Sequence, residues 1–249
     1  MTAFKDHFSG HASDYTRYRP SWQAGLFAHL AGMCLNHRHA WDCGTGGGQA
    51  ALLLTPYFER VSATDASANQ VAQAPPHPSI TYGVASAEES GLANASVDLI
   101  NVCQAAHWFS FDAFFQEVRR IAAPGCLLAL SGYGLFELAP EIDTIVADVY
   151  QDIMPWWPPE RSHIEAAYAS LPFPFEEIAM PAFYMEAHWN LDHLIGYLGT
   201  WSAVRRCITE TGKDPVAPVA AKLASLWGAA PSHERLVRWP LFFRVAKVS

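Results

Sequence analysis

A glycine-rich segment at residues 42–49, DCGTGGGQ, is the clearest chemical signal in this 249-residue chain. It follows a short apolar run, and glycines at such a turn let the backbone bend sharply and approach a ligand closely. The dinucleotide pattern G-x-G-x-x-G would need a glycine where the chain has Gln49, and the Lys-Ser/Thr pair of a phosphate-binding loop is absent. The pattern that does fit is an acid followed by alternate glycines, namely Asp42, Gly44, Gly46 and Gly48.

The charge of Asp42 discriminates between ligands at this turn. A carboxylate at the end of a strand repels a pyrophosphate and favours a ligand with an ammonium group. S-adenosylmethionine has such a group on its methionine part, so we expect this cofactor at the turn. The alternative is a glycine-rich turn that binds nothing.

A second acid, Asp65, ends the next apolar run, 23 residues after Asp42. In doubly wound folds, an acid about 20 residues downstream of the glycine turn accepts hydrogen bonds from ribose hydroxyls. The alternative is an aspartate that caps a helix or a turn. Both acids fall at the carboxyl ends of predicted neighbouring strands, where ligands bind in open α/β sheets.

Short apolar runs alternate with helix-like segments between residues 38 and 133. We predict strands at 40–43, 61–64, 80–82, 97–103 and 126–130, and an amphipathic helix at 111–121. This alternation is typical of parallel βαβ units. The predicted fold is therefore α/β: a doubly wound, Rossmann-like, mostly parallel seven-stranded sheet with helices on both faces and an inserted helical cap.

The remaining segments define the expected domains. Residues 135–175 are rich in proline and aromatic side chains and predict the inserted cap. A sixth strand is expected at 177–185, a helix at 192–207 with Asp192 as N-cap, and a last strand at 237–248. The predicted divisions are an N-terminal helical lid (1–34), the cofactor-binding core (35–134), the cap (135–175) and the C-terminal completion of the sheet (176–249).

The composition excludes several classes of function. Lys and Arg number 16 against 24 Asp and Glu, a formal charge of −8, and no Lys/Arg cluster stands out, so we expect no nucleic-acid partner. No apolar stretch is long enough to span a membrane, and the start of the chain lacks the apolar core of a signal peptide; we expect a cytoplasmic protein. The five cysteines lack zinc-ligand spacing, so we expect no metal.

These motifs resemble those of the class I methyltransferases, in particular the methyltransferase type 11 branch. SATDAS is similar to that family's second-strand acid motif, SAEESGL to its adenine-side loop, SVDLINVCQAAHW to its fourth strand, and RRIAAPGCLLAL to its turn into the fifth strand. FSGHASDYTRYRP, TWSAVRR and RWPLFFR resemble segments of the trans-aconitate-methyltransferase-like relatives. The resemblance covers nearly the whole chain.

The resemblance implies a set of cofactor contacts. The methionine side would be lined by Asp42 and the glycine loop, and the ribose hydroxyls would be held by Asp65. The adenine would lie between Ser86 and Ala87, although many relatives have an aspartate where Ser86 stands. The complete set of cofactor-binding residues is Tyr15, Arg19, Asp42, Gly44, Gly46, Gly48, Asp65, Ala66, Ser86, Ala87 and Gln104. Gln104 would lie beside the transferred methyl group, and Tyr15 and Arg19 would close over the cofactor.

The methyl acceptor is the less defined part of the site. His107, in the loop after the fourth strand, is the candidate base, with a structural histidine as the alternative. Arg161 is a candidate to hold an anionic acceptor, and Trp108, Tyr133 and Trp157 are candidates for its apolar pocket, with packing of the cap as the alternative. A carboxylate acceptor would need no base, because it is already ionised.

Three functions remain open at this stage. The first is methyl transfer to a small molecule, such as a carboxylate that becomes a methyl ester. The second is a methyltransferase that acts on RNA or protein. The third is a non-catalytic module that binds S-adenosylmethionine, and the sequence leaves the oligomeric state open.

Overall fold

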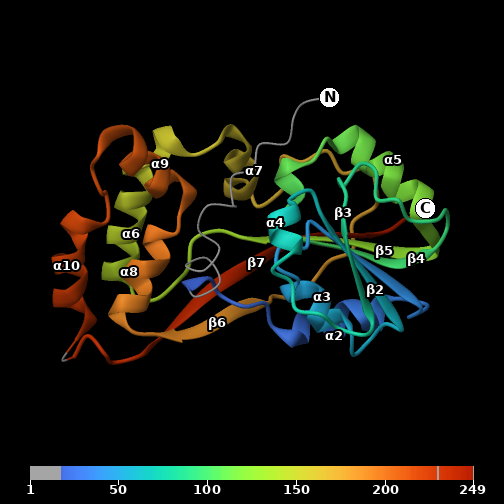
Figure 1. Ribbon diagram of the computed structural model, residues 1–249. Helices are drawn as coiled ribbons and strands as arrows, with labels where there is room; N and C mark the ends of the chain where they lie inside the picture. The colour runs from blue at the N-terminus through green and yellow to red at the C-terminus, as the bar shows by residue number, and fades with distance from the viewer. Residues whose placement is uncertain (1–17, 229, 249) are drawn as a thin grey trace.

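A seven-stranded sheet in the order β3-β2-β1-β4-β5-β7-β6 forms the centre of the molecule (Figure 1). The computed structural model describes residues 18–228 and 230–248. The strands are β1 (His39–Cys43), β2 (Arg60–Asp65), β3 (Ile80–Val84), β4 (Val97–Cys103), β5 (Ala122–Tyr133), β6 (Tyr184–Trp189) and β7 (Arg235–Lys247). Strands β1 to β5 pair in parallel, and β7 runs antiparallel to both β5 and β6. The predicted doubly wound, mostly parallel sheet is confirmed.

Helices cover both faces of the parallel part of the sheet. Helices α2 (Ala24–Met33) and α3 (Gln49–Leu54) pack on one face, and α5 (Phe111–Ile121) packs on the other (Figure 1). Every residue of β1 is buried, as expected for a strand covered on both faces, which explains its continuous apolar run. The short α4 (Ala68–Val71) follows β2. The carboxyl ends of β1, β2 and β4 therefore meet at one edge of the sheet.

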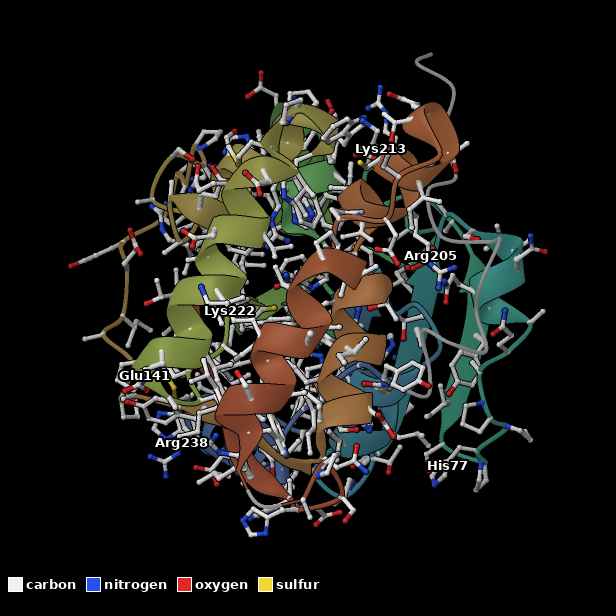
Figure 2. The ribbon with its side chains drawn as sticks, turned by 90° about the vertical axis from the view of Figure 1, so that its left-hand side faces the viewer. His77, Glu141, Arg205, Lys213, Lys222 and Arg238 are labelled. Carbon is white, nitrogen blue, oxygen red and sulfur yellow. The ribbon has the colours of Figure 1, made fainter. Side chains whose placement is uncertain are left out.

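A helical layer encloses the far end of the β6–β7 pair, on the left of Figure 1 and facing the viewer in Figure 2. It consists of α6 (Pro140–Asp152), α8 (Leu191–Gly199), α9 (Ser202–Thr211) and α10 (Ala217–Trp227). Its hydrophobic core includes Trp189, Tyr197 and Trp239 and is distinct from the two cores that flank the parallel strands. The segment at 176–249, which was predicted to complete the sheet and to contain one helix, contributes three helices to this layer.

Short elements connect this layer to the sheet. The turn η1 (Ala106–Trp108) follows β4. Between α6 and β6 lie η2 (Met154–Trp156), η3 (Pro159–Arg161) and α7 (Ser162–Glu165). Because η1 packs against η3, the cap reaches the carboxyl end of β4.

Two predicted elements were wrong in their bounds. The expected strand at 177–185 shares only its last two residues, Tyr184 and Met185, with β6. Pro181 lacks the N–H that a strand needs for pairing. The expected helix at 192–207 is two helices, separated by Thr200 and Trp201. The N-cap is Asn190, not Asp192, because the Asn190 side chain accepts a hydrogen bond from the His193 N–H at 2.9 Å.

Candidate active site

The glycine loop between β1 and α3 is held tightly against the sheet. Gly44, Gly46 and Gly48 have φ angles of 71°, 54° and 83°, in the left-handed region that favours glycine. The N–H groups of Gly44 and Thr45 both donate to the Thr64 carbonyl on β2, at 2.8 and 2.9 Å. A Cβ atom on Gly44 would lie 2.5 Å from the Ala105 Cβ, and one on Gly48 would lie 2.7 Å from the Tyr82 hydroxyl oxygen. Close packing therefore requires glycine at these two positions.

Gly46 is different, because its Cα faces open space. A Cβ atom there would meet only Gln70 Oε1, at 3.9 Å, among the described residues. The Gly46 N–H donates to Asp65 Oδ2 at 2.9 Å, and the Ser67 N–H donates to Asp65 Oδ1 at 2.8 Å. An ionised carboxylate has about four acceptor positions, so the half-buried Asp65 retains two. An open glycine beside a fixed carboxylate with free acceptor positions fits a ribose diol.

Asp42 is completely buried under the glycine loop. Thr45 Oγ1 donates to its Oδ2 at 2.5 Å, and the Asn101 side chain donates to its Oδ1 at 2.7 Å. The Asp42 side chain thus lies beneath the loop, with one hydrogen bond to each of its oxygens, and what it can offer to a ligand is its charge. Burial raises the pKa of Asp42 to about 6, although its hydrogen bonds favour the ionised form.

The raised pKa of Asp42 predicts that S-adenosylmethionine binds less tightly in acid. The cationic cofactor favours ionised Asp42, so binding below pH 6 must release the proton that this carboxyl holds in the free protein. Titration calorimetry between pH 8 and 5.5 should give a Kd that is flat at the alkaline end and rises below pH 6, by at most about tenfold per pH unit. Asp42→Asn should flatten this dependence. A profile that keeps its slope after this substitution would assign it to another group.

The adenine-side loop is fixed by α5. Glu117, a buried residue, accepts hydrogen bonds from the Ser90 N–H at 2.8 Å and from the Ser90 hydroxyl. Glu88 accepts from the Ser110 N–H at 2.8 Å. Within this loop Ala87 is buried and Ser86 is exposed, so the side chain of Ser86 faces outward.

Gln104 directly follows β4 and has a φ of 56°, an uncommon conformation for a residue other than glycine. Its side chain joins the ends of β4 and β5: Nε2 donates to the Tyr133 carbonyl at 3.1 Å, and Oε1 accepts from the Tyr133 N–H at 2.8 Å. Gln104 thus lies at the predicted edge of the sheet with its amide already bonded.

His107 is buried against the cap rather than exposed to a ligand. Its Nδ1 lies 3.3 Å from the Tyr168 hydroxyl, and its ring packs on Trp108 with 4.7 Å between the ring centroids. Burial, together with the nearby Arg161 guanidinium and His163 imidazole, lowers the pKa of His107 to about 3. A group with this pKa is a poor base at neutral pH, so the structure favours the structural alternative for His107.

Replacement of His107 by asparagine tests this assignment. The asparagine amide can keep the contact with Tyr168, so turnover should stay within about threefold while the free energy of unfolding falls by about 1–3 kcal/mol. Initial rates and urea unfolding measure the two quantities. A fall in turnover of about 100-fold without loss of stability would restore His107 as the base.

Arg161 is held in one orientation beside a pocket. Its guanidinium carbon lies 4.5 Å from the centroid of the Trp157 ring and 5.5 Å from that of Tyr150. Arg161 Nε donates to the Tyr150 hydroxyl at 2.9 Å, which leaves its terminal nitrogens without a hydrogen-bond partner among the described residues. A cavity of about 530 Å³ opens here, lined by Gly134, Leu135, Tyr150, Gln151, Met154, Arg161, Ile164, Glu165, Ala167, Pro240 and Phe242.

This pocket, which we call the cap pocket, adjoins the candidate cofactor site. Gly134 directly follows β5, and the Phe242 ring packs over Gly132 so closely that a Cβ there would lie 2.4 Å from it. Gln104 Oε1 lies 3.1 Å from the same Cβ position. Phe242 therefore lines the cap pocket and also packs against the carboxyl end of β5.

The other predicted site residues lie in varied places. The Trp157 ring packs against the Arg161 guanidinium and is not part of the pocket lining. Tyr133 is buried, with its ring 5.9 Å from that of Trp22. Arg19 stacks over the Tyr197 ring of α8 at 5.4 Å, and Ala66 is half-buried next to Asp65. Tyr15 lies outside the described residues.

The sequence analysis missed several residues that build the site. Thr45 and Asn101 bind Asp42, and Tyr150, Glu165 and Phe242 line the cap pocket. Thr45 lies inside the glycine loop, so its spacing from Asp42 was a usable signal. Tyr150 and Phe242 are far apart in the sequence, and only tertiary packing brings them together.

Comparison with known sequences identifies related proteins. A family described as a methyltransferase domain matches residues 41–130, which contain the glycine loop, Asp65 and Gln104. A Dictyostelium discoideum protein named as a methyltransferase is 28% identical over 253 residues, covering 99% of this chain and 96% of the relative.

Comparison with solved structures also identifies methyltransferases. A protein from Anaeromyxobacter dehalogenans, described as a type II methyltransferase, is 44% identical with a TM-score of 0.88, covering 93% of this chain and 98% of that chain. The YcgJ protein of Bacillus subtilis is 18% identical with a TM-score of 0.51, covering 89% and 96% of the two chains, and shares the fold. The segment that matches the methyltransferase-domain family, residues 41–130, includes the strand ends that carry the glycine loop and Asp65.

Proposed function

Because this chain belongs to the class I S-adenosylmethionine-dependent methyltransferases, we propose that it methylates a small molecule at a carboxylate and forms a methyl ester. The observation that supports this proposal is the fixed guanidinium of Arg161 beside the cap pocket, with terminal nitrogens that no described residue binds. Such a group is suited to carboxylates, to which it donates charge-assisted hydrogen bonds. The pocket volume of about 530 Å³ is in the range of small-molecule sites.

In this proposal the cofactor is held by the edge of the sheet. Asp65 accepts from the ribose hydroxyls with Ala66 beside it, the backbone from Gly44 to Gly48 holds the methionine, and Ser86 and Ala87 flank the adenine. Arg19 closes over it. When bound, S-adenosylmethionine supplies a methyl group on a positively charged sulfur, which is open to in-line displacement. The negative charge of Asp42 favours this cation from beneath the loop.

The chain then has to orient the acceptor and exclude water. Arg161 holds one carboxylate oxygen and leaves the other free to attack, and Trp108 and Tyr133 contribute apolar surface near the end of β4. A carboxylic acid with an ordinary pKa of about 4 is ionised at neutral pH and needs no base. A reaction that needs no base agrees with the very weak basicity of His107. The neutral ester loses its ion pair with Arg161, which favours release of the product.

The alternative acceptor, an RNA or a protein, has less support. The chain has a formal charge of −8, and RNA binding depends strongly on basic residues. On the face shown in Figure 2, Arg205, Lys213 and Lys222 of the helical layer and Arg238 of β7 lie spread from one end to the other, with Glu141 between Lys222 and Arg238. This arrangement lacks the continuous basic stripe of a nucleic-acid interface.

A transfer assay tests the proposed function. The protein is incubated with S-adenosylmethionine labelled in its methyl group and with panels of small carboxylates, phenols, amines and short RNAs. We expect label transfer to one or more carboxylates and none to RNA. Transfer only to amines, phenols or RNA would contradict the proposal.

A further inference from the structure

The cap pocket contains a negative charge as well as Arg161. Glu165 lines the pocket four residues after Arg161, at the end of α7. Side chains at this spacing on a helical segment commonly form a direct ion pair. Here the two are joined through a third group instead: Arg161 Nε donates to the Tyr150 hydroxyl at 2.9 Å, and that hydroxyl donates to Glu165 Oε1 at 2.9 Å.

This arrangement keeps both charges available to a ligand. Tyr150 is buried, and burial raises its pKa to about 12, so its hydroxyl remains a neutral bridge at every pH of interest. The terminal nitrogens of Arg161 and the second oxygen of Glu165, Oε2, have no hydrogen-bond partner within the described part of the chain. The pocket therefore has fixed donors on one side of Tyr150 and a fixed acceptor on the other.

We propose that the cap pocket selects acceptors that carry one carboxylate for Arg161 together with a hydroxyl or ammonium group for Glu165, and that Glu165 excludes dicarboxylates. This inference rests on the proposed function, since it takes the cap pocket as the acceptor site. The physical basis is charge matching. A hydroxyl or ammonium group of the acceptor donates a hydrogen bond to Glu165. A second carboxylate at that position repels the Glu165 carboxylate, and neither group can donate a hydrogen bond to the other.

The test measures binding of a matched set of small probes in the presence of saturating S-adenosylhomocysteine. The probes are butanoate, 4-hydroxybutanoate, 4-aminobutanoate, 3-aminopropanoate and succinate, and titration calorimetry gives each Kd. For the unmodified protein we expect the hydroxy- and amino-carboxylates to bind at least about fivefold more tightly than butanoate, with succinate the weakest. In Glu165→Gln the advantage of the amino-carboxylates should disappear, and succinate should bind about tenfold more tightly than before.

Two further variants complete the test. Glu160→Gln removes a carboxylate from η3 that does not line the pocket, so its probe ranking should match that of the unmodified protein. Arg161→Met should weaken binding of every carboxylate probe by about 100-fold. Glu165 is exposed, so its replacement leaves the core intact, and thermal unfolding checks this.

The possible outcomes separate this inference from the function on which it rests. If carboxylates accept the methyl group but Glu165→Gln leaves the ranking of the probes unchanged, the role of Glu165 is wrong and the proposed function stands. If the unmodified protein prefers succinate, the inference is also overturned. If no carboxylate binds or accepts label, the proposed function itself fails.

Discussion

Replacement of Asp65 by alanine is expected to weaken S-adenosylmethionine binding by at least about 100-fold, because two ribose hydroxyls lose a charged acceptor worth about 1.5–3 kcal/mol each. The same carboxylate also accepts from the Gly46 and Ser67 N–H groups, at 2.9 and 2.8 Å. Its loss therefore loosens the loop that carries the open glycine. Calorimetry with S-adenosylmethionine and with S-adenosylhomocysteine should show the same loss, since both ligands have the ribose.

Two variants provide the comparison for Asp65. Asp65→Asn keeps one acceptor oxygen and should give an intermediate affinity. Asp112→Ala removes an exposed carboxylate from the first turn of α5, away from the loop, and should leave the Kd unchanged. Full affinity in Asp65→Ala would show that the ribose is held elsewhere.

Replacement of Arg161 by methionine should lower kcat/KM for the carboxylate acceptor by about 100-fold, because the carboxylate loses charge-assisted hydrogen bonds worth about 1.5–3 kcal/mol each. Methionine keeps an extended side chain that can pack against Trp157, so the cap should stay folded. The Kd for S-adenosylmethionine should change by less than about twofold, because Arg161 lines the cap pocket. Arg161→Lys should retain part of the activity.

Arg119 offers a matched control for Arg161. It also stacks on an aromatic ring, with its guanidinium carbon 5.0 Å from the centroid of Phe175, but it lies on α5 and outside the cap pocket. Arg119→Met should therefore leave kcat/KM unchanged. Equal losses in the two variants would indicate a general effect of removing a stacked arginine and would count against the acceptor role.

The parallel part of the sheet could be predicted because burial on both faces leaves a strong local signal. The predicted strand at 97–103 agrees with β4 at both ends, and the helix predicted at 111–121 agrees with α5. The glycine loop was equally readable, since left-handed backbone conformations at Gly44 and Gly48 leave glycine as the one residue that fits without strain.

The cap could be predicted as helical, but its construction could not. Its core joins α6 to helices that come after β6, so the contacts link segments that are about 40 to 90 residues apart in the chain. The strand expected at 177–185 was also not predicted correctly. An apolar run predicted a strand there, but Pro181 prevents regular pairing and β6 begins only at Tyr184.

The roles of Asp42, His107 and Arg161 depend on charge and burial, which residue type alone does not give. Asp42 and His107 both stood out as chemically active types, yet both are buried and bonded, Asp42 to Thr45 and Asn101, and His107 to Tyr168. Their shifted pKa values come from desolvation, which a sequence does not display. Arg161, in contrast, gained support because its stacking on Trp157 fixes a guanidinium beside a cavity.

The chemical form of the transferred methyl group tests the central claim most directly. After transfer of label to a small carboxylate, the product is treated with mild alkali, which hydrolyses a methyl ester but not a methyl ether or a methylated amine. We predict that the label is released as volatile methanol, and that Arg161→Met forms about 100-fold less of this alkali-labile product at low acceptor concentration. Label that stays in a base-stable product would contradict the assignment of the carboxylate as the methylated group.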